Sequence, residues 1–286
     1  MLFVGPPGAG KSMLAQRLPS ILPGLTPGEI LECTAVYSAA GLLGRDSVVT
    51  QRPFRAPHHT ISDAGLIGGG SMPTPGEVSL AHRGVLFLDE MPEFRRSALE
   101  ALRQPLEDCT VRISRAAASL SFPADFQLIA AMNPCPCGFL GHPDRPCSCT
   151  PVQVARYRAR ISGPLLDRID LHLWIDPVDA SGIFNRGQGA SSHEVRARVE
   201  AAREIQLARG FINARIPQES MERICRLDTA SRGMLVNAVK RAALSMRALG
   251  RVIKVARTIA DLEGSPSIRD VHVAEALQFR PGMVED

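Results

Sequence analysis

The stretch that decides the fold class is Gly5-Pro6-Pro7-Gly8-Ala9-Gly10-Lys11-Ser12. It follows the apolar residues 2–4 and leads into a helical pattern that starts at Lys11. Glycines at this spacing let backbone N–H groups turn inward around a phosphate, and the following helix offers the positive end of its dipole. Lysine then reaches the β- and γ-phosphates, and the serine hydroxyl binds Mg²⁺. The motif predicts a phosphate-binding loop in a parallel α/β domain.

Composition limits the alternatives. The chain has 286 residues, of which 45% are hydrophobic and 22% charged, values typical of one large or two modest folded domains. No apolar run reaches the roughly 18 residues of a membrane helix, and the N-terminus does not resemble a signal peptide. We therefore expect a cytoplasmic protein with no membrane partner. The net charge of +4 permits nucleic acid as a partner but does not require it.

The order of strand and helix patterns predicts the domain organisation. Strand patterns occur at 2–4, 85–88, 126–132 and 171–175, a hairpin pattern joins 111–114 to 120–122, and residues 44–77 show no clean period. Capping boxes predict helix starts at Thr26 and Thr150, each followed by proline. Helical patterns at 193–209, 218–227, 229–246, 248–262 and 268–279 follow, the last with Ser267 as its expected cap. We expect an α/β domain at 1–180, a linker at 181–192 and an all-α domain at 193–286.

Two further positions predict the chemistry of the phosphate site. Asp89 and Glu90 directly follow the apolar strand 85–88, where one carboxylate can hold Mg²⁺ and the other can orient or deprotonate an attacking water. Asn133 ends the next buried strand, where an amide can touch the γ-phosphate or that water. Alone, Asn133-Pro134 would be read as a turn.

Together these residues resemble an AAA+ ATPase, with a Walker A loop, a Walker B Asp-Glu pair and a sensor-1 asparagine. The resemblance implies a ring in which one subunit supplies an arginine to the ATP of its neighbour. Arg168 fits that role, and an internal pairing with Asp167 or Asp170 is the alternative. Ser245-Met246-Arg247 resembles a sensor-2 segment, so Arg247 would touch the γ-phosphate, in its own subunit or across the interface. The alternative is a solvated arginine.

Four of the seven cysteines fall within fifteen residues: Cys135, Cys137, Cys147 and Cys149. In a cytosolic chain such a cluster indicates metal before disulfides, and two close pairs of thiolates suit tetrahedral zinc. We expect a structural zinc loop at 134–150. Free thiols are the alternative, and His142 is a possible substitute ligand.

Other basic and histidine residues leave their roles open. Arg112 and Arg115 lie on the expected hairpin, and Arg156, Arg158 and Arg160 lie on the helix after Thr150. Either cluster could follow a nucleic-acid backbone, and ordinary surface arginines are an equal alternative. The pair His58-His59 has no nearby carboxylate in the sequence, which favours a structural or intersubunit role over metal binding.

The chain resembles the magnesium-chelatase-like AAA+ ATPases of the YifB and ComM type over about residues 1–281. The resemblance is carried, in this order, by the segments RPFRAPHHTIS, GLIGGG, PGEVSLAHRGVLFLDEMPEF, NPCPCG, RISGPLLDRIDLH and KVARTIADLEG. This resemblance implies a P-loop domain with an insert after helix 2, a hairpin before sensor 1, the zinc loop and an all-α lid domain. It also implies a hexameric ring that uses ATP and Mg²⁺ to act on DNA, as a branch-migration helicase or translocase in natural transformation or recombination. Family members carry a Lon-like domain ahead of the ATPase, so we expect this chain to be their C-terminal part.

Two other functions are compatible with the same motifs. One is an ATP-driven protein remodeller that resembles a magnesium-chelatase motor subunit. The other is an inactive truncated fragment.

Overall fold

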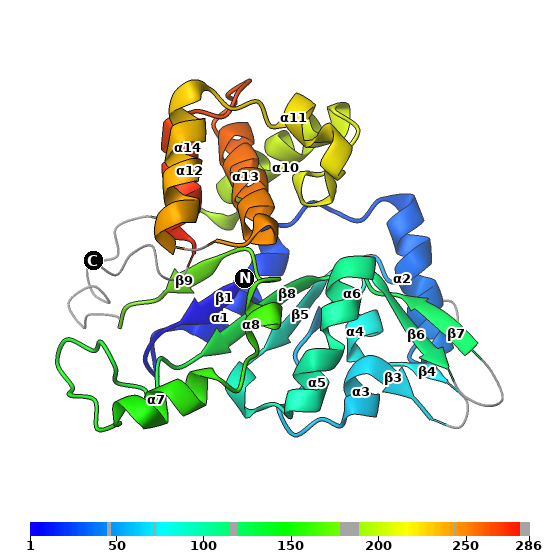
Figure 1. Ribbon diagram of the computed structural model, residues 1–286. Helices are drawn as coiled ribbons and strands as arrows, with labels where there is room; N and C mark the ends of the chain where they lie inside the picture. Colours follow the sequence, from blue (N-terminus) through cyan, green and yellow to red (C-terminus); the bar gives the residue numbers. More distant parts are fainter. Residues whose placement is uncertain (45–46, 71–72, 115–118, 178–188, 243, 281–286) are drawn as a thin grey trace. The chain divides into compact units, whose positions relative to one another are not determined.

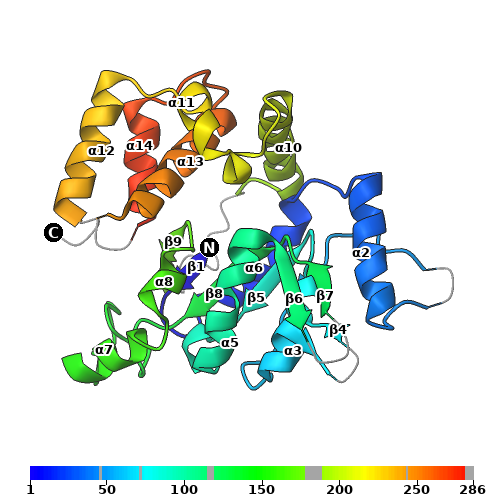
Figure 2. The same cartoon turned by 45° about the vertical axis from the view of Figure 1, so that its right-hand side comes forward.

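A computed structural model describes residues 1–44, 47–70, 73–114, 119–177, 189–242 and 244–280 (Figures 1 and 2). The chain forms two compact units. The first comprises Met1–Pro19, Gly24–Ile169 and Leu173–Gly187, and the second comprises Ser20–Pro23, Asp170–His172 and Gln188–Asp286. The expected linker at 181–192 lies mostly outside the described residues.

A five-stranded sheet forms the centre of the first unit. Its order is β2 (Phe54–Arg55), β5 (Val85–Leu88), β8 (Gln127–Met132), β1 (Leu2–Val4) and β9 (His172–Trp174). The pairs β2–β5, β5–β8 and β8–β1 are parallel. All four residues of β5 are buried, as expected for a parallel strand that is covered on both faces. The prediction of a parallel α/β domain is thereby confirmed.

Short helices and two hairpins surround this sheet. The helices are α1 (Lys11–Arg17), α2 (Pro27–Ala39), α3 (Asp63–Ile67), α4 (Glu77–Leu80), α5 (Arg96–Ala101), α6 (Arg103–Asp108), α7 (Pro151–Arg158) and α8 (Gly163–Leu166), with 3₁₀ turns η1 (Leu18–Ile21) and η2 (Met91–Glu93). The hairpins are β3 (Gly68–Gly69) with β4 (Thr74–Pro75), and β6 (Thr110–Ser114) with β7 (Ser119–Pro123). Capping boxes begin α2 at Thr26 and α7 at Thr150, as predicted.

The second unit is helical. It contains α10 (Ser192–Ala208), α11 (Met221–Ile224), α12 (Thr229–Ala242), α13 (Met246–Leu262) and α14 (Asp270–Gln278), with 3₁₀ turns η3 (Asn213–Arg215) and η4 (Gln218–Ser220). Its core contains Leu235, Val252, Ala256, Ile268 and Val273. A buried ion pair joins Arg257 to Asp261, with Nη2 3.0 Å from Oδ1, one turn apart on α13.

Some details of the expected pattern differ from the structure. Residues 44–77, where the sequence indicated an insertion with little regular structure, include the edge strand β2 of the main sheet at 54–55, besides α3 and the β3–β4 hairpin. The helix expected at 229–246 ends at Ala242, and Ser245 caps a new helix by accepting a hydrogen bond from the backbone N–H of Ala248 at 3.1 Å. The N-cap of α14 is Arg269 rather than Ser267. The backbone N–H of Arg269 donates to His272 Nδ1 at 3.0 Å.

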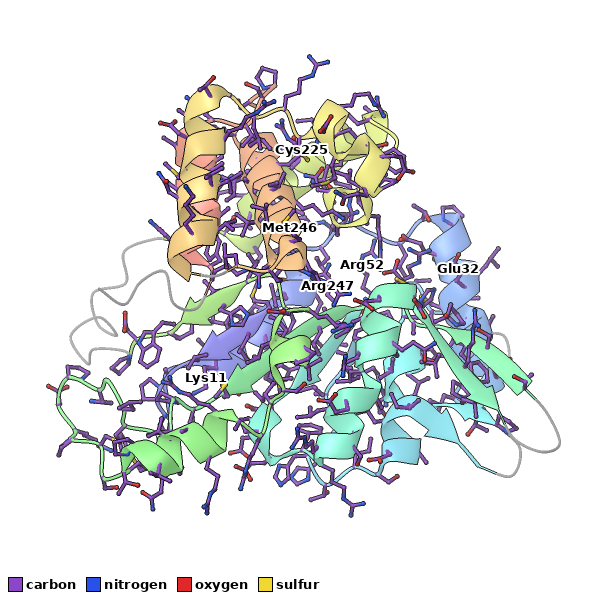
Figure 3. All side chains as sticks on the ribbon, in the orientation of Figure 1. Lys11, Glu32, Arg52, Cys225, Met246 and Arg247 are labelled. Atoms are coloured by element: carbon purple, nitrogen blue, oxygen red, sulfur yellow. The ribbon has the colours of Figure 1, made fainter. Side chains whose placement is uncertain are left out.

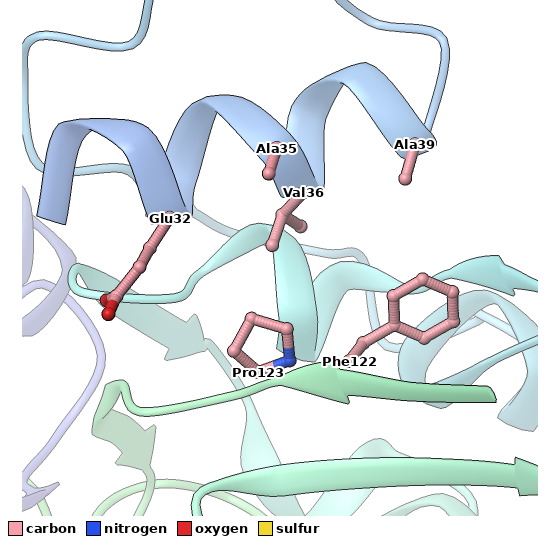
Figure 4. Close-up of a pocket in the computed structure, with 6 residues that line it drawn as sticks. All are labelled: Glu32, Ala35, Val36, Ala39, Phe122 and Pro123. Carbon is pink, nitrogen blue, oxygen red and sulfur yellow. The ribbon is translucent and has the colours of Figure 1, made fainter. Parts of the chain in front are cut away.

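An open pocket lies between α2 and β7, lined by Glu32, Ala35, Val36, Ala39, Phe122 and Pro123 (Figure 4). Its lining contains one charged side chain and none of the residues of the phosphate motif, so we do not assign it to nucleotide binding. None of the helices that the structure describes is long and apolar enough to cross a membrane.

Candidate nucleotide and metal sites

The phosphate motif, the acidic pair and Asn133 meet at one edge of the sheet. They follow the carboxyl ends of β1, β5 and β8, and these strands are neighbours in the order β5-β8-β1. Ligands of parallel sheets bind outside the carboxyl ends of the strands. Gly8 and Gly10 have positive φ angles of 80° and 82°, which shape the loop between β1 and α1.

Lys11 is held inside this loop. Its Nζ donates to the backbone oxygens of Gly5 at 2.7 Å and Pro6 at 2.8 Å, and to Asn133 Oδ1 at 3.2 Å. An ammonium group has three N–H donors, so all three are used within the chain and a phosphate must replace at least one partner. Burial lowers the pKa of Lys11, while the nearby carboxylates of Asp89 and Glu90 oppose that shift.

Ser12 and Asp89 form the pair expected of a magnesium site. The Ser12 hydroxyl donates to Asp89 Oδ2 at 2.6 Å, and Asp89 Oδ1 accepts from the backbone N–H of Glu90 at 3.0 Å. Mg²⁺ prefers oxygen ligands and keeps several waters beside one or two carboxylates and substrate phosphates. Both side chains belong to exposed or half-buried residues, which leaves room for such waters. The oxygens present therefore fit Mg²⁺.

Glu90 lies beside Asp89 in a left-handed backbone conformation, with φ 50° and ψ 45°. This conformation costs a non-glycine residue roughly 1–2 kcal/mol, and such residues cluster at functional sites. Its side chain is 59% exposed, and Oε2 lies 3.6 Å from His59 Nδ1. The histidine pair therefore has a carboxylate neighbour in space that the sequence did not reveal. Recognition of the short strand β2 would have indicated it, because β2 lies next to β5.

Asn133 connects the lysine to the wall of the site. Besides accepting from Lys11, it lies near Tyr157 of α7, whose phenol accepts a hydrogen bond from the Asn133 backbone. Burial raises the pKa of Tyr157 to about 12, so this phenol stays neutral. The sequence interpretation did not single out Tyr157.

Arg168, the expected trans-acting arginine, pairs within its own chain. Its Nη2 lies 3.0 Å from Glu107 Oε1, and its Nη1 donates to the backbone oxygen of Pro164 at 2.6 Å. The side chain is only 6% exposed and lines an open pocket together with Glu100, Arg103 and Asp108. The sequence named Asp167 or Asp170 as an internal partner; the structure gives Glu107, which lies at the end of α6.

Arg247 belongs to the second compact unit and is exposed at the first turn of α13 (Figure 3). Lys11 belongs to the first unit. The proposed contact of Arg247 with a phosphate therefore stays a prediction.

The cysteines of the loop 134–150 converge. The four Sγ atoms of Cys135, Cys137, Cys147 and Cys149 lie within 4.8 Å of one another. Cys135 Sγ lies 3.4 Å from Cys137 Sγ, and Cys147 Sγ lies 3.6 Å from each of these two sulfurs. Zinc with Zn–S bonds of about 2.3 Å holds its sulfurs about 3.8 Å apart, so the cluster fits the ion.

Backbone N–H groups support this cluster. Leu140 donates to Cys135 Sγ, and Cys137 donates to Cys149 Sγ, each at 3.4 Å. Backbone N–H groups of Phe139 and Ser148 lower the pKa of Cys137, which favours the thiolate there, while burial and the neighbouring sulfurs raise the pKa of Cys147 and Cys149. His142 instead packs edge-on against Phe139 and accepts from the backbone N–H of Asp144, so the four sulfurs converge without it.

The two arginine clusters differ. Arg158, the last residue of α7, donates to the backbone oxygen of Pro134 at 3.4 Å, and Arg160, two residues beyond the helix, pairs with Glu93 at 2.7 Å. All three arginines are exposed, but these two also bond within their own unit. On the β6–β7 hairpin Arg112 is exposed, and Arg115 lies outside the described residues.

Comparisons with known proteins agree with this geometry. The family model described as magnesium chelatase, subunit ChlI, matches residues 1–183, and the model of its C-terminal part matches residues 189–280. The chain is 48% identical over 283 residues to competence protein ComM of Haemophilus influenzae and 45% identical over 284 residues to the uncharacterized protein YifB of Escherichia coli. An uncharacterized protein of Mycobacterium tuberculosis is 47% identical over 287 residues.

Each alignment covers 98% of this chain but only 55% or 56% of the relative, so the chain spans about half the length of these proteins. The first family model nevertheless covers more than half of this chain. The chain belongs to the magnesium chelatase ChlI family, whose members combine an AAA+ P-loop fold with a C-terminal helical domain.

Proposed function

We propose that this chain is an ATP-hydrolysing motor unit that works on DNA. The observation that carries the ATPase part is the meeting of Lys11, Ser12, Asp89 and Asn133 at one sheet edge, with Glu90 beside them. In this proposal Lys11 leaves its backbone partners to bind the β- and γ-phosphates. Ser12 and Asp89 hold Mg²⁺, which neutralises charge on the phosphates.

Glu90 orients the attacking water and accepts its proton, and Asn133 binds the γ-phosphate or that water. Arg168 and Arg247 neutralise the charge that develops on the γ-phosphoryl oxygens. Because Arg168 serves a neighbouring subunit in this scheme, the working form is a homo-oligomeric ring, which we propose to be a hexamer. The four cysteines bind one structural zinc.

Two observations support an action on DNA. One relative is named a competence protein, and the β6–β7 hairpin carries the exposed Arg112. A hairpin arginine can contact phosphates without reading base sequence, which suits a branch-migration helicase or translocase. The second candidate is an ATP-driven protein remodeller, which the magnesium chelatase description of the family favours.

The test is ATP hydrolysis by the purified chain with Mg²⁺, alone and with single-stranded or branched DNA. The proposal predicts a DNA-stimulated rate that is lost in Lys11→Ala, together with a weaker stimulation in Arg112→Ala and a salt dependence of DNA binding. A rate of ATP hydrolysis that is the same with and without DNA would favour the protein remodeller. A chain that hydrolyses no ATP, alone or joined to the part of its relatives that lies outside the matched region, would contradict both.

A further inference from the structure

The cysteine loop (residues 134–150) and the phosphate-binding loop (residues 5–12) begin side by side. Val4 of β1 pairs with Met132 of β8, and the backbone N–H of Gly5 donates to the Met132 oxygen at 3.3 Å. One loop therefore leaves β1 at the point where the other leaves β8. Only Asn133 and Pro134 separate β8 from Cys135, whose side chain is fully buried.

The cysteine loop then returns over the phosphate-binding loop. A turn in which the Gly138 N–H donates to the Cys135 oxygen at 3.0 Å brings Gly138 against Pro7. A Cβ added to Gly138 would lie 2.6 Å from Cδ and 2.8 Å from Cγ of Pro7, closer than side chains pack. The same position is 3.9 Å from Cγ of Asn133. Gly138 thus packs against the phosphate-binding loop and lies close to the asparagine that holds Lys11.

A second glycine of the loop has the same backbone conformation but a different neighbour. Gly141 has φ 76°, against 86° for Gly138, and a Cβ there would lie 3.3 Å from the ring of Trp174. Trp174 is the single tryptophan of the chain. The pair offers a matched comparison, because both positions resist a side chain equally on backbone grounds while only one contacts the phosphate-binding loop.

We propose that the cysteine loop is a positioning wall of the nucleotide site: when a metal joins its four cysteines, Gly138 is pressed against Pro7 and fixes the phosphate-binding loop. The physical reason is that few apolar residues of the loop are buried, so closure by the four sulfurs supplies much of its order. The inference rests on the proposed nucleotide function but concerns the order of residues 5–12, which can be measured without nucleotide.

The first experiment is hydrogen exchange, read by mass spectrometry, on the zinc-loaded chain and on the chain stripped by a chelator, both without nucleotide. The proposal predicts faster exchange of the amides of residues 5–12 after zinc removal. Trp174 fluorescence checks that the loop has changed. Gly138→Ala with zinc bound should raise exchange in residues 5–12, and Gly141→Ala should leave it unchanged although it alters Trp174 emission.

The second readout is the affinity for Mg-ATP, measured by titration calorimetry. We expect Gly138→Ala to weaken binding about tenfold or more, because small displacements of a phosphate-binding group have large effects. Gly141→Ala should stay within about twofold of the unaltered chain. Zinc content and melting temperature, measured for both variants, exclude loss of metal or fold as the cause.

The outcomes separate the two ideas. If the unaltered zinc-loaded chain does not bind Mg-ATP, the proposed function fails while hydrogen exchange still decides the inference. Exchange in residues 5–12 that is indifferent to zinc and equal in the two variants would overturn the inference, whatever the affinity for ATP. A chain that takes up no metal would overturn it as well.

Discussion

At the residue scale, Lys11 links three parts of the site through its donors to Gly5, Pro6 and Asn133. This arrangement keeps a buried ammonium satisfied before a phosphate arrives. The sequence predicted Lys11 from the motif alone, because the glycine spacing permits few other loop conformations. It could not predict the bond to Asn133, which lies 122 residues away.

The contact between His59 and Glu90 gives a prediction at the same scale. His59→Ala removes the contact between Nδ1 and Glu90 Oε2 at 3.6 Å, so Glu90 loses a neighbour that limits its orientation. We expect kcat for ATP to fall about tenfold, below the 10²–10⁴ that a general base contributes, with KM little changed. Steady-state kinetics of hydrolysis measure both constants.

His58→Ala is the matched control, because the His58 ring lies 4.1 Å from that of His59, tilted by 33°, but its Nδ1 hydrogen-bonds to Thr60 rather than to Glu90. An equal loss in both variants, or a change confined to KM, would contradict this role of His59.

At the scale of elements, local rules predicted the helix starts at Thr26 and Thr150, because a capping box is complete within four residues. The strand β2 was missed because it has two residues within a proline-rich segment and is formed by pairing with β5. The partner of Arg168 was missed for a similar reason: Glu107 is distant in the sequence and meets Arg168 only in the folded chain. Long-range pairing, not local preference, decides both.

The pairing of Arg168 with Glu107 predicts competition between two partners. If Arg168 serves a neighbouring ATP, it must leave Glu107, and Glu107→Gln weakens that internal bond. We expect half-maximal hydrolysis at a lower protein concentration in Glu107→Gln, measured by titrating the protein at fixed ATP. Asp108→Asn, the next residue along α6, should behave like the unaltered chain.

Arg168→Ala completes this test. An arginine finger contributes about 10³–10⁵ to kcat, so hydrolysis should nearly vanish in this variant while the fold is retained. Full activity of Arg168→Ala would contradict the assigned role.

The buried His82 predicts how stability depends on pH. Burial lowers the pKa of His82 although its Nε2 bonds to Glu32; Arg83 lowers it further and Asp125 opposes. The folded state therefore binds fewer protons than the unfolded state below about pH 6.5, the ordinary histidine value, so stability is full above that pH and falls as the pH drops through it. Denaturant unfolding followed by Trp174 fluorescence at pH 7.5 and 5.5 measures this loss.

His82→Gln should lose less stability between the two pH values than the unaltered chain. The exposed His193→Gln should lose as much as the unaltered chain. A pH dependence that is identical in all three would show that His82 does not titrate with unfolding.

At the scale of the whole molecule, the two compact units have separate cores, and the helical unit contains a buried charge network that composition could not reveal. Asp261 accepts from Arg257, from Arg209 and from Asn213 Nδ2 at 2.7 Å. Arg257 also donates to the backbone oxygens of Ser265 and Pro266, which ties α13 to the loop before α14. Residues 254–264 (KVARTIADLEG), one of the segments that carry the family resemblance, thus contain charged side chains that stabilise the helical unit.

Removing one partner of a buried ion pair costs about 3–5 kcal/mol, because the other charge stays buried without compensation. We expect Arg257→Leu to destabilise the helical unit by that amount, as measured by urea unfolding followed by circular dichroism. Arg196→Leu, which breaks the exposed pair with Glu200 on α10, should change stability by less than about 0.5 kcal/mol. Similar losses in the two variants would argue against the buried network.

The Mg²⁺-dependent rate of ATP hydrolysis by the purified chain, beside Lys11→Ala and Glu90→Gln, tests whether this site is the nucleotide site. We expect hydrolysis that requires Mg²⁺ and is lost in both variants, with Mg-ATP still bound by Glu90→Gln but not by Lys11→Ala. Hydrolysis that persists in Lys11→Ala would contradict the assignment of this site.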